Sequence, residues 1–243
     1  MLLPALLVSA IIGGCDEPSG HRWEKMRRPP EHWLDVALEA ENADERRRAV
    51  DALADSRAGT SDWAVRAFET IARTDGDAMV RTAALRGLRR SAGPQTVPLL
   101  VKLLRQGDAP PDVRAAPAPV RWEATRLLCE LCASGCVTSE QADAVVELLL
   151  HRATLDTDRN VRLCAIRALA SFRQRRVVAT LIGVLRERDF ALQSAAEHSL
   201  GVLTGRTHDF DADAWSDWLN ASGDPFAGSL PPAAAVGVGA ARG

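Results

Sequence analysis

The sequence predicts an all-α fold, an α-solenoid of about five helical hairpins closed by a short C-terminal helix. A sequence pattern, DGDAMVRTAALRGL at 75–88, recurs as DTDRNVRLCAIRAL at 156–169, and we call this pattern the frame. Amphipathic segments with helical spacing lie between the copies of this frame, and Pro and Gly residues separate them. No segment alternates apolar and polar residues in the way that a strand does. A repeating helical unit of this length is typical of a solenoid.

Five copies of the frame are spaced 31 to 41 residues apart, and we count positions in each copy from the residue equivalent to Val80. Position 0 is Glu45, Val80, Val120, Val161 and Leu192. Position +4 is Ala49, Ala84, Ala124, Ala165 and Ala196, and position +8 is Leu53, Leu88, Leu128, Leu169 and Leu200. These three positions share one face of a helix. The constant Ala allows a neighbouring helix to approach closely, and the Leu fills the space beside it.

Polar residues near the start of each copy predict how these helices begin and how they are joined. Asp or Asn at position −3 suits an N-cap, because its side chain accepts from free backbone N–H groups. Position −3 is Asn42, Asp77, Asp158 and Asp189, with Pro117 in the third copy, and position +1 is Arg46, Arg81, Arg121, Arg162 and Gln193. We expect these arginines to pair with Asp residues of adjacent turns and to form a ladder between repeats. Anion or nucleic-acid binding is the alternative, which the net charge of −2 disfavours.

Another helix is expected before each of these helices from the second copy on. The amphipathic segments span 63–72, 97–106, 144–153 and 177–186. Thr138 and Gln141 match a capping box ahead of the third of them. The Pro-rich segment GDAPPDVRAAPAP predicts a longer loop that interrupts the stack before the third copy.

The segment LTGRTHDFDADAWSDWLN predicts a short final helix. Asp211 suits its N-cap, and Phe210 and Trp215 suit a hydrophobic staple. Trp215 and Trp218 share one face, so we expect both indoles to cover the end of the last repeat. The segment 222–243 is rich in Gly, Pro and Ala, and it is predicted to be disordered.

The frame resembles that of the HEAT-repeat family, particularly its short bacterial form. The residues that carry the resemblance are Asp75, Asp77, Val80, Arg81, Ala84 and Leu88, and Asp156, Asp158, Val161, Arg162, Ala165 and Leu169. The resemblance covers about residues 31–221 and implies a right-handed α-solenoid. Glu45 and Gln193 depart from the frame in the outer copies, where atypical capping repeats are expected.

The first residues, MLLPALLVSAIIGGC, resemble the signal peptide of bacterial lipoproteins. The resemblance implies a signal peptide at 1–14, acylation of Cys15 and a flexible tether at 15–30. Acidic residues after Cys15 then indicate the inner membrane of a bacterial cell envelope, facing the periplasm. No Lys or Arg precedes the apolar run, so an apolar N-terminal helix or a true start at Met26 stays open.

There are four further cysteines, Cys129, Cys132, Cys136 and Cys164. Our favoured interpretation is that they are small, buried thiols in helices. Disulfides, with Cys132–Cys136 as the first choice, and a metal site are the alternatives. Three alternating carboxylates, Asp209, Asp211 and Asp213, copy the start of a calcium loop, but the turn Gly and the final Glu are missing. The spacing of the His residues matches no metal motif, and we nominate no catalytic, cofactor or metal residue.

These features favour a membrane-anchored scaffold that offers an extended groove to a protein or peptide partner and does not bind nucleic acid. The alternative is an accessory subunit or lyase-like factor that acts on a small molecule or a cofactor-bearing protein, because similar short HEAT repeats occur in bilin lyases. A purely structural envelope component is a third hypothesis. We expect a protein that is not an enzyme and has no cofactor.

Overall fold

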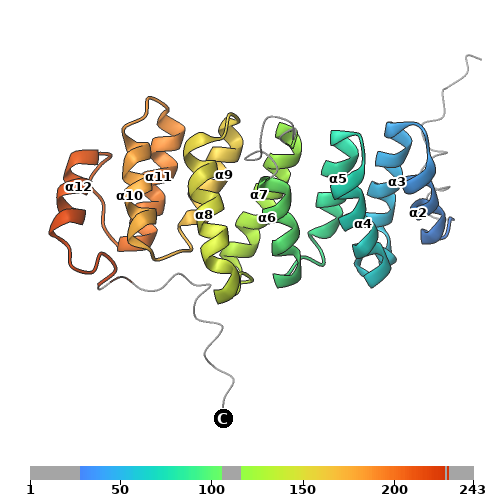
Figure 1. Cartoon of the computed structure of the whole chain (residues 1–243), viewed down its shortest axis with the longest axis horizontal. Helices are drawn as coiled ribbons and strands as arrows, with labels where there is room; N and C mark the ends of the chain where they lie inside the picture. Colours follow the sequence, from blue (N-terminus) through green and yellow to red (C-terminus); the bar gives the residue numbers. More distant parts are fainter. Residues whose placement is uncertain (1–27, 106–115, 228, 230–243) are drawn as a thin grey trace, which may run out of the picture.

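A computed structural model describes residues 28–105, 116–227 and 229 of the chain. The described residues form eleven α-helices and no strand. Ten of the helices pair as five antiparallel hairpins, and Figure 1 shows these hairpins side by side in one row, with α12 at one end and α2 at the other. The predicted all-α solenoid is therefore confirmed.

Each hairpin has a first and a second helix. The first helices are α2 (Pro30–Glu39), α4 (Asp62–Thr74), α6 (Val97–Arg105), α8 (Ser139–Leu155) and α10 (Arg175–Leu185). The second helices are α3 (Ala43–Asp55), α5 (Ala78–Leu88), α7 (Ala118–Ala133), α9 (Arg159–Leu169) and α11 (Phe190–Thr204). The final helix is α12 (Ala212–Ala221), and short 3₁₀ turns lie at η1 (Arg57–Thr60) and η2 (Pro94–Thr96). The five copies of the frame are the five second helices.

The Ala and Leu positions of the frame are the packing surface of the solenoid. All five alanines at +4 and all five leucines at +8 have no exposed surface. Each second helix packs against its own first helix and against the second helices on either side, in the order α3, α5, α7, α9, α11. Small side chains at +4 permit this close approach, and burial of each Leu contributes about 2 kcal/mol.

The predicted N-caps are confirmed. The side chains of Asn42, Asp77, Asp158 and Asp189 each accept from two backbone N–H groups in the first turn of a second helix. The third hairpin differs because Pro117 has no side-chain acceptor, and α7 begins without one. Thr138 and Gln141 form the expected capping box at α8.

The C-terminal helix α12 covers the last hairpin through a buried indole. Trp215 has no exposed surface, and its Nε1 donates to Glu197 of α11 at 2.8 Å. Asp211 caps α12 as predicted. The expected staple is wrong in its partner, because the Phe210 ring lies 5.8 Å from that of Phe190 and Trp215 instead packs edge-on against the His208 ring. The backbone just before the Asp211 cap has a positive φ at Asp209 and at Phe210.

The boundary of the predicted disordered tail also differs. Residues 222–227 and Ser229 lie on the solenoid, where Phe226 packs on the core and its carbonyl accepts from Arg173. The Ser229 hydroxyl also donates to the Leu203 carbonyl at 3.0 Å. The predicted signal peptide at 1–14, Cys15 and nearly all of the tether lie outside the described residues.

Candidate protein-binding surface

The arginines at +1 form the predicted ladder, and the acceptor is the acidic residue at position −5 of the next hairpin. Arg46 donates through Nε and Nη2 to the two carboxylate oxygens of Asp75, at 2.8 and 3.0 Å. Arg162 donates to Glu187 at 2.5 Å. Gln193 replaces Arg in the last hairpin and donates to the carbonyls of Leu185 and Glu187. The ladder ties the connecting turn of one hairpin to that of the next.

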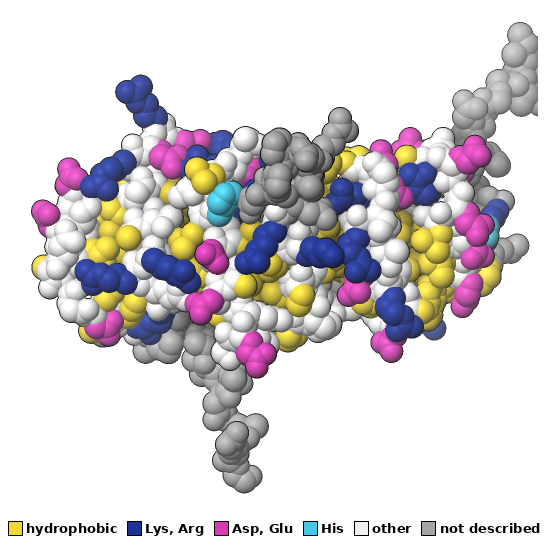
Figure 2. Space-filling model, viewed as in Figure 1, with side chains coloured by type: hydrophobic (Ala, Val, Ile, Leu, Met, Phe, Trp, Pro, Cys, Tyr) yellow, Lys and Arg dark blue, Asp and Glu magenta, His cyan; other side chains and the backbone are white. Residues whose placement is uncertain are grey.

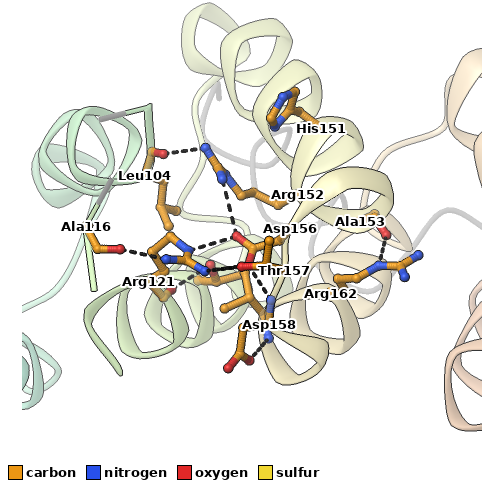
Figure 3. A network of polar contacts seen from close by, with 12 residues as sticks. Leu104, Ala116, Arg121, His151, Arg152, Ala153, Asp156, Thr157, Asp158 and Arg162 are labelled. Carbon is orange, nitrogen blue, oxygen red and sulfur yellow. Dashed lines mark hydrogen bonds and ion pairs between the residues drawn. The ribbon is translucent and has the colours of Figure 1, made fainter. Parts of the chain in front are cut away.

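The strongest rung of the ladder lies between the third and fourth hairpins (Figure 3). Arg121 donates through Nε and Nη2 to the carboxylate of Asp156, at 3.0 and 2.8 Å. Arg152 of α8 donates to the same carboxylate at 3.2 Å and to the Leu104 carbonyl at 2.6 Å. Arg121 and Arg152 are only 8% and 4% exposed, and the Asp156 side chain is 1% exposed. This buried cluster joins α6, α7, α8 and the turn before α9.

The charge of Asp156 is maintained against its burial. Burial opposes ionisation of this carboxyl group, but hydrogen bonds from Arg121, from the backbone N–H of Asp158 and from Arg152 favour the charged form more. The pKa of Asp156 therefore lies below its ordinary value. Asp75 has a lowered pKa for the same reasons, with Arg46 as its cation.

The rung between the second and third hairpins has no carboxylate partner among the residues that the structure describes. Arg81 donates through Nε to the Ala72 carbonyl at 2.9 Å, but its buried Nη2 has no hydrogen-bond partner among the described residues. The sequence has Ala115 at position −5 of the third hairpin, where Asp75 and Asp156 stand in the second and fourth. Burial lowers the pKa of the Arg81 guanidinium.

A second set of positions points away from the packing surface. Positions +2 and +6 share one helix face, and most of their side chains in α5, α7, α9 and α11 are exposed or half-buried, whereas Thr82 at +2 of α5 is buried. We define the second-helix face by Arg86, Trp122, Arg126, Leu163, Arg167 and His198, which occupy these positions in α5, α7, α9 and α11. Trp122 is 36% exposed at the centre of this face. The sequence analysis did not identify these residues, although the same register arithmetic that locates Ala at +4 locates them.

One buried carboxylate supports the arginines of the second-helix face. The Glu123 side chain on α7 is 1% exposed, and it pairs with Arg126 on the same helix and with Arg86 on α5, whose Nε lies at 3.6 Å. Glu130 accepts from Arg126 at 2.7 Å and from Arg89 at 2.8 Å. These contacts hold the guanidinium groups of α5 and α7 in place on the surface.

The outer part of this face contains an exposed arginine that forms no ion pair with a described carboxylate. Arg167 on α9 and His198 on α11 are exposed, and no described carboxylate forms an ion pair with either of them. Positions +2 to +10 of α5, α7 and α9 contain five arginines and two glutamates, with no Lys or Asp. The second-helix face is therefore basic, although the whole chain has a net charge of −2.

Outside the second-helix face, basic and acidic side chains are interspersed on the surface. Figure 2 shows one face of the solenoid, on which Lys and Arg side chains are spread along the whole length with Asp and Glu between them. Among the exposed arginines outside the second-helix face, Arg176 pairs with Asp143 and Arg186 with Asp213.

The described cysteines are free thiols, in agreement with the favoured interpretation. Cys132 is buried, and Cys129, Cys136 and Cys164 are half-buried. Burial raises the pKa of the Cys129 thiol to about 11 and also raises that of Cys164. The alternative, a Cys132–Cys136 disulfide, is not formed between these described cysteines.

The other candidate residues from the sequence are the possible metal ligands and the site of lipid attachment. Asp211 caps α12, and the described residues contain no group of His, Cys, Asp and Glu side chains arranged to hold a metal ion. Cys15, the predicted site of lipid attachment, lies outside the described residues. Within the part of the chain that the structure describes, every helix is too short or too polar to cross a bilayer.

Comparison with known proteins agrees with this architecture. A family model of HEAT repeats matches residues 30–118 and 113–201, which together cover more than half of the chain. The chain belongs to the HEAT-repeat family. The predicted family is thus confirmed. No curated protein matches the chain.

Two solved structures resemble this HEAT-repeat protein in fold. An engineered protein superposes with a TM-score of 0.52 at 20% sequence identity, and the match covers 81% of this chain and 93% of that one. A computationally designed armadillo repeat protein for modular peptide recognition gives a TM-score of 0.50 at 12% identity, with 78% and 87% covered. At these identities the likeness concerns the fold alone.

Proposed function

We propose that this HEAT-repeat protein is a scaffold that holds a protein or peptide partner on its second-helix face. The observation that carries the proposal is the exposure of Trp122, Arg86 and Arg167 on neighbouring second helices, with the half-buried Arg126 between them in the row at +6. Trp and Arg are the residues that contribute most to binding at protein interfaces. A repeat protein designed for modular peptide recognition shares the fold, which supports the same use here.

The chain acts by binding and not by catalysis. A pocket of about 300 Å³ lies between the first two hairpins, and its ionisable side chains are Arg46 and Asp75, which already neutralise one another. A second pocket of about 350 Å³ lies beside α4 and contains neither His nor Cys. The second pocket contains hydroxyl and carboxylate side chains, but among the described residues no hydroxyl in either pocket hydrogen-bonds to a carboxylate that could activate it. Thr74 and Ser91 instead donate to backbone carbonyls. The alternative of an accessory or lyase-like factor therefore has no residue to support it in these pockets.

Anchoring through Cys15 at the inner membrane, on the periplasmic side, is a further part of the proposal. The apolar run followed by Gly13, Gly14 and Cys15 supports it. Metabolic labelling with a radioactive fatty acid tests it: the wild type incorporates label and sediments with membranes, and Cys15→Ser does neither. Labelling of Cys15→Ser at the wild-type level would refute the anchor without affecting the scaffold.

Site-specific photo-crosslinking tests the scaffold. A photo-reactive amino acid in place of Trp122 is expected to capture one protein in the native cell, in a defined complex. The matched control replaces Arg66, an exposed residue of the first helix α4, and is expected to capture no such complex. Capture from position 66 but not from position 122 would contradict the proposed surface.

A further inference from the structure

We propose that the second-helix face binds an extended, acidic peptide segment whose carboxylates follow the arginines from hairpin to hairpin. The inference rests on the proposed function and names the chemistry of the partner. Arg86, Arg126 and Arg167 occupy the same position +6 in three consecutive second helices, and His198 occupies it in the fourth. A row of like charges at equivalent positions of a repeat is complementary to a row of opposite charges on a linear partner.

The two parts of the row contribute differently. Arg86 and Arg126 share the buried carboxylate of Glu123, so they are oriented before a ligand arrives and retain N–H donors at the surface. Arg167 has no carboxylate within ion-pair distance among the residues described, and its charge is exposed. Preorganised donors reduce the entropic cost of binding, and the exposed charge attracts the carboxylate. A partner with the opposite charge is therefore favoured over a basic or neutral one.

The geometry of the stack sets the spacing of the partner. Helices packed face to face lie about 8–10 Å apart, and an extended chain advances about 3.3 Å per residue. One hairpin thus corresponds to about three residues of an extended peptide. Carboxylates at every third residue of the partner meet successive arginines, and an apolar side chain near the centre contacts Trp122, which is 36% exposed.

The arginine contacts and the Trp122 contact come from neighbouring helices that pack against each other. Arg86 of α5 contacts Glu123 of α7, and α7 packs against α9, which carries Arg167. Trp122 lies four residues before Arg126 on one face of α7. An acidic segment that crosses α5, α7 and α9 therefore meets guanidinium groups from three helices, with an indole one helical turn from the central one.

The test measures fluorescence anisotropy with the full chain, purified in detergent. The probe is a fluorescein-labelled twelve-residue peptide with Glu at every third position, Leu near the centre, and Ser and Gly elsewhere. We expect saturable binding that weakens as salt rises, and no binding by the same peptide with Lys in place of Glu. A peptide with its glutamates clustered at one end is expected to bind several-fold more weakly. Equal binding of the Glu and Lys peptides, or no binding of either, would overturn the proposal.

Variants locate the site. Arg167→Glu is expected to weaken binding of the Glu peptide about tenfold, and Trp122→Ala by a similar factor. Arg66→Glu makes the same charge reversal on the exposed surface of α4 and is expected to leave binding unchanged. Circular dichroism spectra and melting curves are recorded for each variant. Arg167 has no ion pair to a described carboxylate, so its replacement leaves the fold intact. Equal losses for Arg167→Glu and Arg66→Glu would contradict the proposed site.

The outcome separates this inference from the proposed function. If position 122 crosslinks a partner in cells and the Glu peptide neither binds nor competes with that partner, the acidic segment is wrong and the scaffold stands. If position 122 captures nothing, the scaffold itself fails. A single-stranded oligonucleotide that binds more tightly than the Glu peptide, and loses binding in Arg167→Glu, would assign the face to nucleic acid instead.

Discussion

Two junctions of the same solenoid differ in their charges. Between the third and fourth hairpins, Asp156 is held by Arg121 and Arg152, and all three side chains are buried. Between the second and third hairpins, Arg81 forms no ion pair with a described carboxylate, and its Nη2 is buried without a hydrogen-bond partner among the described residues. The alanines at +4 and leucines at +8 are equally buried at both junctions. Apolar packing therefore suffices to stack hairpins, and the ion pairs add local stability that depends on single residues.

The largest expected effect comes from removing the carboxylate of the stronger junction. Asp156→Ala removes the carboxylate that two buried guanidinium groups share, and we expect a loss of about 3–5 kcal/mol in the free energy of unfolding. Asp75→Ala is the matched change at the first junction, where Arg46 is more exposed, and we expect about half that loss. Urea denaturation followed by circular dichroism measures both. Equal losses would show that burial of the arginines does not set the cost.

Replacing the arginine itself sharpens the comparison. Arg121→Met keeps the aliphatic part of the side chain but leaves Asp156 and the Ala116 carbonyl without this donor, so we expect a loss of about 2–4 kcal/mol. Arg81→Met removes one hydrogen bond and also an unpaired buried nitrogen, so we expect a change within about 1 kcal/mol. The same denaturation experiment compares the two. A larger loss for Arg81→Met would reverse the proposed difference.

Acid is expected to weaken the ladder selectively. The pKa values of Asp75 and Asp156 lie below their ordinary range in the folded chain, and that of Asp189, hydrogen-bonded by Arg159, is about 2. A carboxyl group with a lowered folded pKa stabilises the fold above its unfolded pKa of about 3.9 and loses this contribution as the pH falls through the folded pKa. We therefore expect unfolding free energy to fall between about pH 5 and pH 2.

The matched variant for the acid experiment is Asp156→Asn, which has no carboxyl group to protonate. Its stability is expected to lie below that of the wild type at pH 7, and the two curves are expected to converge as the pH falls, because protonation neutralises Asp156 in the wild type. Thermal melts at a series of pH values measure this. A constant separation from pH 7 to pH 2 would contradict the lowered pKa of Asp156.

The smallest expected effect concerns the start of α9. Asp158 accepts from the backbone N–H groups of Asn160 and Val161, at 2.9 and 3.1 Å. Asp158→Ala is expected to lower stability by about 1 kcal/mol, whereas Asp158→Asn retains an acceptor and is expected to change it by only a few tenths. The third hairpin lacks this cap because of Pro117, so it shows that a single cap is dispensable.

The sequence was sufficient to locate the packing surface because every copy repeats the same side chains there. The Ala at +4, the Leu at +8 and four of the five N-caps lie where periodicity predicts them. The ladder was also predictable in kind, since Arg at +1 recurs in four copies. Its exact acceptor was not predictable, because the distance between position +1 of one hairpin and position −5 of the next depends on how the hairpins are stacked.

The missed features depend on tertiary contacts that occur once. Arg152 donates to Asp156 from the first helix α8. The repeated pattern of the second helices does not determine how α8 is aligned with α9. Glu123 is buried, although Glu is normally exposed, because Arg126 on its own helix and Arg86 on the neighbouring helix α5 pair with it. The first helix α2 lacked a specific prediction, but Trp33, Val36 and Ala37 have the helical spacing that would have indicated it. Phe226 packs on the core from a segment whose composition indicates disorder.

The indole of Trp215 has a consequence for assembly. Stacked hairpins are in principle open-ended, and an uncovered last hairpin would accept the first hairpin of another molecule, so that chains could add to one another as a fibre. With α12 laid across that end and Trp215 bound to Glu197, the docking surface for an incoming copy is already occupied. A single aromatic side chain thus helps to keep a modular stack finite.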